Sequence, residues 1–433
     1  MLVPNDQLRD LNERAKGGDV VAFRRGSLLF AHPNAVREIL ITHDAAFQKS
    51  PALRKASWTL GNGLLTADGA LHKKQRPIMQ PALHTKRLAG YAGIMAKHAL
   101  GVAGSWHDGQ AIDAHAEMTA LTLYIVAEAL FGTALGPEVD AVSQAMDYNV
   151  EAFRKLVRKW GPLLAILPTP QNVRYLLARR KLISVLRRIV IERRNSGVQK
   201  DDLLGRLLSA RTPEGKPAMS QKQLIDECVT LFAAGHETTA NALTFTLVLL
   251  AQHPQEQEKL RVEVDAVMPS ADYELTIDDV DRLPYTRQII AESMRLYPPA
   301  WIQGRQAMAD VTIDGHAVPR GQVVFISQWL THRDPRWWPN PGQFDPSRFD
   351  EANPAPAADG SPRPRWAYYP FGGGSRSCIG EAFAWAELTI ALATLIRRWR
   401  FEVAADSGSV ELEPGITLRP AGPVRLQVFS PSP

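Results

Sequence analysis

The chain of 433 residues is 45% hydrophobic, which is enough for a substantial buried core. Its formal net charge is only +5 and no dense basic stripe carries interleaved aromatic residues, so we exclude a nucleic-acid-binding protein and expect an acidic protein partner. Two cysteines cannot form a disulfide framework, which fits a reducing compartment. The N-terminus is polar and no apolar run is long enough to span a bilayer. We therefore expect a cytoplasmic protein without a signal peptide or an integral membrane segment.

Helical periodicity predominates along the chain, and no shift in composition marks a domain boundary. We therefore expect a single domain over residues 1–433. Near the N-terminus, residues 19–23 and 27–30 are short apolar runs around a turn and predict a hairpin. Helices are expected over residues 33–41, 117–133 and 139–157, and prolines break the apolar connection over 161–170.

A basic segment follows the turn signal Asp68-Gly69. His72 and Arg76 are four residues apart, so on a helix they share a face. Two hydrogen-bond donors on one face suit a pair of carboxylates, and the alternative is an ordinary solvated basic turn. Pro77 is expected to end or kink this helix.

A second basic segment is the helix predicted over residues 173–194, which is dense in arginine and lysine. Such a run usually forms a solvated face. The alternatives are contact with a membrane surface or with an anionic substrate or partner. The basic residues near 179–188 also favour, slightly, a substrate that carries a carboxylate.

The longest predicted helix covers residues 220–253, with Ser220 as its cap and Pro254 as its stop. Its centre contains Gly235 and two adjacent threonines, which are costly in a helix interior. Small residues there leave room for a flat ligand to lie against the helix backbone. The alternative is that another helix packs closely at this point. Thr238 can bond the carbonyl of Ala234 or release it to another partner.

A further helix is predicted over residues 283–297, where Glu292 and Arg295 are three apart and can pair on one face. Short strands are expected around the turn at Asp314-Gly315 and over 323–326. Residues 334–370 are crowded with proline, glycine and aromatic residues, and predict a long irregular connection.

That connection leads into a cysteine loop, residues 371–380, which contains three consecutive glycines. Cys378 lies just before a helix predicted over residues 381–400, where unpaired N–H groups should favour its thiolate. One thiolate is too few for a zinc or iron–sulfur site, which needs about four protein ligands. It is enough for a haem, because the porphyrin supplies the in-plane ligands.

These motifs and their order resemble the cytochrome P-450 family of haem-thiolate monooxygenases over nearly the whole chain. The matching positions are, in chain order, His72 and Arg76, the stretch from Ala234 to Thr239, Glu292 and Arg295, Arg305, Arg348, and Phe371, Gly374, Arg376, Cys378 and Gly380. The resemblance implies a mainly α fold with small β-sheets. Haem b (iron protoporphyrin IX) is then expected between a long distal helix and the cysteine-loop helix.

The resemblance also implies roles for individual residues. Cys378 is the expected metal ligand, with Phe371 beside its sulfur, and Thr238 and Glu237 form the expected catalytic pair that relays protons to oxygen. The residues expected to bind the haem propionates are His72, Arg76, Arg305 and Arg376. The expected pocket walls are Leu64, Leu65, Leu231, Ala234, Trp301, Ile302, Ile416 and Thr417.

By the same resemblance, the protein inserts one atom of O2 into a hydrophobic small molecule such as a terpenoid, a fatty acid or a similar lipid. Electrons are expected from a ferredoxin or flavodoxin with its NAD(P)H reductase. The expected docking face contains Lys73, Lys74, Arg397, Arg398 and Arg400. The alternatives are a haem-thiolate peroxygenase or isomerase and a non-enzymatic haem sensor, and the acid–alcohol pair Glu237-Thr238 argues against both.

Overall fold

Helices dominate the part of the chain that the computed structural model describes, namely residues 2–84, 87–132, 148, 169–198, 200 and 202–431. The helices are α1 (Asp6–Ala15), α2 (Pro33–Arg37), α3 (Pro51–Lys55), α4 (Ser57–Leu60), α5 (Gly69–Met79), α6 (Leu88–Ser105), α7 (Ala114–Phe131), α10 (Pro170–Ser196), α11 (Leu203–Ser209), α12 (Gln221–Gln252), α13 (Pro254–Val267), α14 (Ile277–Val280), α15 (Pro284–Leu296), α16 (Gln328–Thr331) and α17 (Glu381–Arg398). Within these residues no helix is long and apolar enough to cross a membrane. The predicted helix over 139–157 lies outside them except for residue 148.

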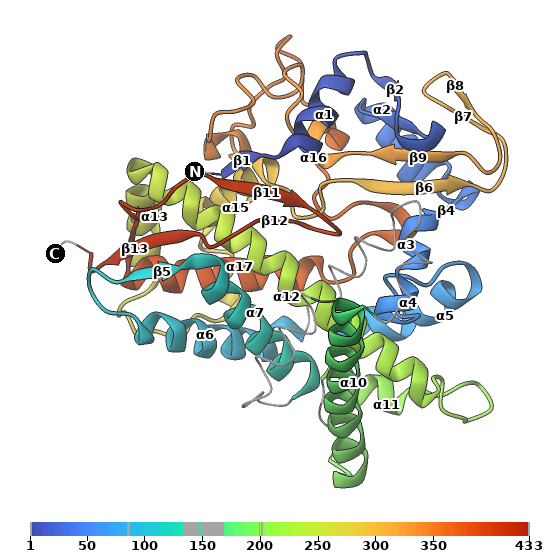
Figure 1. Ribbon diagram of the computed structural model, residues 1–433. Helices are drawn as coiled ribbons and strands as arrows, with labels where there is room; N and C mark the ends of the chain where they lie inside the picture. Colours follow the sequence, from blue (N-terminus) through green and yellow to red (C-terminus); the bar gives the residue numbers. More distant parts are fainter. Residues whose placement is uncertain are drawn as a thin grey trace.

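The long helix α12 crosses the molecule and is packed between α7 and the layer formed by α15 and α17 (Figure 1). The predicted cap is confirmed, because the Ser220 hydroxyl accepts a hydrogen bond from the N–H of Gln223 at 3.2 Å. Pro254 begins α13 directly after α12. Most side chains of α12 are buried, as expected for a helix that is largely apolar on all sides.

Short strands form small separate sheets at different places around the helices (Figure 1). The strands are β1 (Leu2–Pro4), β2 (Val20–Ala22), β3 (Leu28–Phe30), β4 (Phe47–Lys49), β5 (Ala111–Asp113), β6 (Gln303–Ala307), β7 (Val311–Ile313), β8 (His316–Val318), β9 (Val323–Ile326), β10 (Arg400–Val403), β11 (Val410–Pro414), β12 (Leu418–Pro420) and β13 (Arg425–Phe429). The largest sheet has the order β2-β3-β9-β6-β4. The predicted N-terminal hairpin is confirmed, with Val20 opposite Phe30.

Three predicted helix boundaries differ from the structure. α5 continues through Pro77 to Met79, because the carbonyl that loses its partner belongs to the exposed Lys73 and can bond water. The helix expected over 33–41 changes to a π-helical turn after Arg37. The basic helix α10 begins at Pro170, where the Thr169 hydroxyl caps it.

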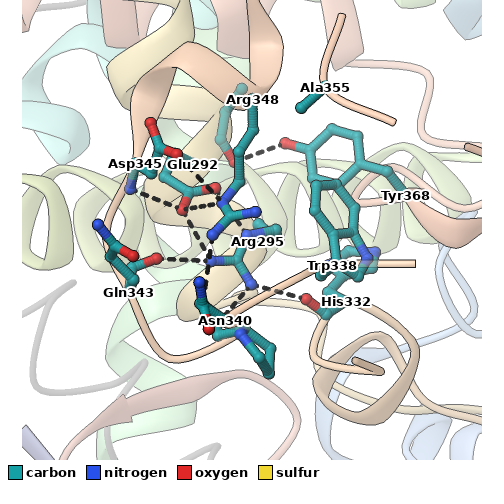
Figure 2. A network of polar contacts seen from close by, with 12 residues as sticks. Glu292, Arg295, His332, Trp338, Asn340, Gln343, Asp345, Arg348, Ala355 and Tyr368 are labelled. Carbon is teal, nitrogen blue, oxygen red and sulfur yellow. Dashed lines mark hydrogen bonds and ion pairs between the residues drawn. The ribbon is translucent and has the colours of Figure 1, made fainter. Parts of the chain in front are cut away.

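The irregular segment 334–370 is held by a buried charged network (Figure 2). Arg295 and Glu292 are wholly buried and form a bidentate pair, with Nε–Oε2 at 2.6 Å and Nη2–Oε1 at 2.7 Å. Arg348 approaches the same carboxylate, with Nε 3.5 Å from Oε1. The pairing of Glu292 with Arg295, and the approach of Arg348, agree with the prediction.

The same network fixes the backbone of the segment. Arg295 donates to the carbonyls of His332 at 2.9 Å, Pro341 at 2.8 Å and Gln343 at 3.1 Å. The Glu292 carboxylate accepts the N–H of Asp345 at 3.0 Å. A segment with little regular structure of its own is thereby tied to α15, which fixes where the cysteine loop begins.

Candidate active site

A cavity of about 1220 Å³ lies between the middle of α12, the helix α5, the strand β6, the cysteine loop and the start of α17. Its volume exceeds that of a typical pocket for one drug-sized ligand, about 300–1,000 Å³. It therefore has room for a flat macrocycle with a substrate beside it. Every residue that the sequence assigned to the cofactor lines this cavity, namely His72, Arg76, Arg305, Phe371, Arg376 and Cys378.

The glycines of the cysteine loop are required by the packing of the protein itself. A side chain at Gly373 would lie 2.6 Å from the ring of Trp366, and one at Gly374 would lie 2.0 Å from the carbonyl oxygen of Leu40. Gly374 also has a φ of 69°, in the left-handed region. The flat group that packs against Gly373 is thus the indole ring of Trp366.

The Cys378 side chain is open to the cavity, and its N–H closes the loop on the carbonyl of Phe371 at 3.0 Å. Burial raises the pKa of the Cys378 thiol, while the N–H of Gly380 and the charge of Arg76 act in the opposite direction. The backbone N–H at the helix N-terminus therefore favours the thiolate, as predicted, but burial opposes it. A metal ion bound to this sulfur would supply the missing stabilisation of the anion.

One wall of the cavity carries a cluster of basic side chains. Arg76 donates to the carbonyl and hydroxyl oxygens of Ser377 at 2.8 and 3.0 Å, which joins α5 to the cysteine loop. Arg376 pairs with Asp44 at 2.9 Å and with Asp68 at 3.0 Å. Because both arginines also line the cavity, the loop and the basic wall form one unit.

Arg305 provides a test of whether an anionic cofactor fits. Its side chain lies deep in the protein and makes two long hydrogen bonds, to the carbonyl of Gly304 at 3.2 Å and to Gln303 Oε1 at 3.3 Å. It has no ion pair with any described residue, and burial lowers its pKa to about 10. A buried cation without a counter-ion is costly. The site therefore suits a carboxylate such as a haem propionate.

His72, which the sequence analysis predicted, and Lys49, which it did not, also belong to this basic wall. Burial and the neighbouring cations lower the pKa of His72 to about 4, so it is a neutral hydrogen-bonding group near pH 7. Lys49 was missed by the sequence analysis, although it lines the cavity and is 6% exposed. Nothing near it in sequence marks it, because its neighbours Asp68 and Arg376 are brought to it only by the fold.

On the opposite wall, α12 presents Leu231, Ala234 and Thr238 to the cavity. The Thr238 hydroxyl donates to the carbonyl of Ala234 at 2.7 Å, which is the first of the two arrangements expected for it. A side chain at Gly235 would lie 3.0 Å from Val126 of α7. Helix packing therefore accounts for Gly235, whereas Ala234 leaves space on the cavity side.

Glu237 does not line the cavity among the described residues. Its Oε1 accepts a hydrogen bond of 2.6 Å from the hydroxyl of Thr417, in the turn between β11 and β12. Thr417, expected as a pocket wall, thus holds the acid instead, while its neighbour Ile416 lines the cavity. The turn that touches the cavity is therefore bonded directly to Glu237.

The other expected apolar walls line the cavity: Leu64, Leu65, Leu231, Ala234, Trp301 and Ile302. None of the basic residues of α10 does, within the described part of the chain. Arg179 donates to the carbonyl of Thr59 at 3.2 Å, and Arg188 lies 3.7 Å from Glu192. The preference for a substrate with a carboxylate loses its support, because these charges lie elsewhere.

The expected docking face is only partly basic. Lys73 and Lys74 are exposed on α5. Three arginines expected with them each pair with an acidic side chain of this chain, namely Arg397 with Asp265, Arg398 with Asp272 and Arg400 with Glu402. The unneutralised charge therefore lies mainly on α5.

A mainly α fold around a cavity that joins one cysteine, a basic wall and a long helix is typical of a haem-thiolate protein. A family model described as Cytochrome P450 matches residues 11–428. The chain belongs to the cytochrome P450 family, whose cofactor is haem. It is an oxidoreductase that incorporates oxygen.

Relatives and a solved structure agree with this assignment. The chain is 35% identical to cyclooctatin synthase of Streptomyces melanosporofaciens over 98% of its own length and 92% of the relative's. It is 34% identical to pentalenene oxygenase of Streptomyces avermitilis, over 90% and 86% of the two lengths. The structure of retinoic acid bound cyanobacterial CYP120A1 superposes with a TM-score of 0.86 at 26% identity, covering 99% of this chain and 95% of the other. The predicted fold class is confirmed.

Proposed function

We propose that the protein is a haem b-dependent monooxygenase that inserts one atom of O2 into a terpenoid or similar lipid. The observation that carries the proposal is that a single cavity joins Cys378, Thr238 and the buried Arg305, and then continues between apolar walls. Relatives named cyclooctat-9-en-7-ol 5-monooxygenase and pentalenene oxygenase act, by their names, on molecules that are mostly hydrocarbon. A cavity with such walls suits molecules of that kind.

When bound, haem supplies the iron at which O2 is reduced. In our proposal the Cys378 thiolate is the protein ligand of that iron, and the N–H of Gly380 donates to the sulfur and moderates its basicity. Arg76, Arg305 and Arg376 hold the propionates as charge-assisted hydrogen-bond donors. His72 contributes a neutral donor to the same wall.

Protons reach the oxygen side through α12. Thr238 faces the cavity and places its hydroxyl near the reacting atoms, while Glu237, which the Thr417 hydroxyl holds in position, exchanges protons with solvent. Electrons come from a ferredoxin or flavodoxin with its NAD(P)H reductase, docked near Lys73 and Lys74. We further propose that residues 1–433 act as one haem domain, since one cluster of buried apolar residues runs from Leu2 to Val428.

Turnover with surrogate redox partners and NADPH, on a panel of terpenoids and fatty acids, tests the proposal. A product that carries one oxygen atom from labelled O2 is the expected result. Turnover only with added hydrogen peroxide would indicate a peroxygenase, and rearrangement without oxygen uptake would indicate an isomerase. Haem binding without turnover of any panel member would favour a sensor. Each of the last three results would overturn the proposal.

Arg305→Gln is expected to weaken haem binding. The change removes a buried charge whose hydrogen bonds to a propionate are worth about 1.5–3 kcal/mol, so the rate of haem transfer to an acceptor protein should rise roughly 10–100-fold. Arg320→Gln, in the exposed turn after β8, is the matched control and should leave the transfer rate unchanged. Equal rates of haem transfer from the parent protein, Arg305→Gln and Arg320→Gln would contradict a propionate site at Arg305.

Thr417→Val is expected to release the Glu237 carboxylate and to misdirect protons. A charge-assisted hydrogen bond of this kind contributes about 1.5–3 kcal/mol, so product formed per NADPH should fall roughly 2–10-fold with more hydrogen peroxide released. Thr417→Ser keeps the hydroxyl and should restore coupling. If the valine variant had the coupling and the pH profile of the parent protein, Glu237 would not depend on Thr417.

A further inference from the structure

The segment between α4 and α5, residues 61–67, forms one wall of the cavity and is here called the pocket loop. It contributes Leu64 and Leu65 to the cavity but belongs to no helix or strand. Within the loop, the N–H of Ala67 donates to the carbonyl of Gly63 at 2.9 Å. Its position therefore depends largely on side chains that reach it from other elements.

The helix α12 holds the pocket loop from one side. The N–H of Leu64 donates to Glu227 Oε2 at 2.8 Å, and the N–H of Asn62 donates to Asp226 Oδ2 at 3.1 Å. A side chain at Gly63 would lie 2.0 Å from the hydroxyl oxygen of Thr230, so the loop backbone rests directly on the helix. Two consecutive acids of α12 thus fix two peptide groups of the loop.

The strand β4 holds the loop from the other side. The Lys49 ammonium group donates to the carbonyls of Leu64 and Ala67, both at 2.6 Å. Leu64 therefore has its N–H bound by a buried acid and its carbonyl bound by a buried base. Leu64, whose side chain lines the cavity, is thus held through both its N–H and its carbonyl group.

Glu227 is an unusual choice for a purely structural contact. Its side chain is fully buried, and among the described residues its second oxygen accepts only a 3.2 Å bond from Gln223. A buried carboxylate is costly, and an amide could accept the same N–H without a charge. Burial raises the pKa of Glu227 to about 7, with Asp226 acting in the same direction and Lys49 opposing it.

We propose that Glu227 is a positioning residue of the substrate cavity, whose carboxylate holds the pocket loop in place and so decides which hydrophobic substrates fit against Leu64 and Leu65. The inference rests on the proposed function for the identity of the ligand. The position of the loop, however, is a property of the folded chain and can be measured by itself.

Glu227 and Lys49 hold the pocket loop with opposite pH dependence. A carboxylate accepts a hydrogen bond more strongly than a carboxylic acid, so the Leu64 N–H should be held most firmly above pH 7. Burial lowers the pKa of Lys49 to about 7, so its hold on the two carbonyls weakens as pH rises. Comparing proteins that all keep Lys49 isolates the contribution of Glu227.

The contribution of Glu227 to global stability changes in the other direction. The folded-state pKa of Glu227 is raised, so its stabilising contribution is present at low pH and is lost as pH rises through about 7. A loop that Glu227 holds more firmly as pH rises, while Glu227 contributes less to global stability, cannot owe its firmness to that contribution. This opposition separates a positioning role from a merely structural one.

Hydrogen exchange at single amides of the haem-loaded protein tests the proposal. Leu64 is the reporter, and Ala67 is the reference, because its N–H bonds a backbone carbonyl in the same loop. In the parent protein the protection of Leu64 relative to Ala67 should rise about fivefold between roughly pH 6 and pH 8. In Glu227→Gln, which keeps an acceptor but cannot ionise, the ratio should stay constant.

Substrate affinity, measured from the spectral shift that a bound hydrophobic ligand causes, should follow the same pattern. It should rise with pH in the parent protein relative to Glu227→Gln, in which Lys49 still titrates, and Glu258→Gln, which replaces an exposed acid of α13, is the control that should keep the pattern of the parent protein. A Leu64 ratio that does not change with pH in the parent protein would overturn the inference, even if the glutamine variant failed to fold. Loss of the thiolate haem spectrum with the exchange pattern intact would count against the proposed function alone.

Discussion

Cys378→Ala is expected to abolish monooxygenase turnover and the strongly red-shifted Soret band of the reduced, carbon monoxide-bound protein. Alanine removes the only cysteine that lines the cavity among the described residues. Without the thiolate, electron donation to the iron is lost, and turnover should fall by at least roughly three orders of magnitude, or more than about 4 kcal/mol in the barrier.

Cys228→Ala is the matched control for this experiment. Cys228 is fully buried on α12, and burial raises the pKa of its thiol, so it behaves as a small apolar filler. Its replacement should cost about 1 kcal/mol of stability and leave the spectrum unchanged. A red-shifted band in Cys378→Ala would refute the ligand assignment. An unshifted band in the parent protein would indicate a protonated or displaced cysteine.

Arg295→Met is expected to have the largest effect on stability. The change leaves the carboxylate of Glu292 buried with only part of its charge compensated, and deprives the carbonyls of Pro341 and Gln343 of a donor. Breaking such a buried pair costs about 3–5 kcal/mol, a large part of the stability of a typical protein. Haem content should fall as well, because the segment that leads to the cysteine loop is no longer fixed.

Urea unfolding and haem content at saturation measure this effect, and Arg336→Met is the control. Arg336 belongs to the same irregular segment and pairs with Asp19 and Asp334, but its side chain is 46% exposed. Its loss should cost at most about 1 kcal/mol. Equal losses of stability in both variants would show that the network in Figure 2 does not specifically hold the segment.

The comparison of Glu237 with Cys378 shows how far sequence reasoning reaches. Cys378 can be identified from its neighbours in the sequence, since glycines precede it and a predicted helix follows it. The sequence also identified Glu237, through the same local motif. It could not predict that Thr417, 180 residues away, would hold that carboxylate. Partners of a motif residue come from other elements and leave no local signal.

The basic wall of the cavity illustrates the same limit. His72, Arg76, Arg305 and Arg376 were identified from the resemblance, whereas Lys49 was not, because nothing distinguishes it locally from a surface lysine. Its burial is decided by the pocket loop, which closes over it from the next part of the chain. The pairing of Arg397 with Asp265 and of Arg398 with Asp272 shows the same limit, since these acidic partners lie more than 100 residues away in the sequence.

By itself, the sequence determined the fold class, the long central helix with its cap and stop, the pairing of Glu292 with Arg295, and the cysteine loop. These features depend on periodicity, capping and short spacings, which are written in consecutive residues. The tertiary structure alone decided what the glycines of the loop pack against, that Lys49 faces the cavity, and how Glu227 and Lys49 hold Leu64. Those features depend on burial and on contacts between distant segments, which exist only once the chain has folded.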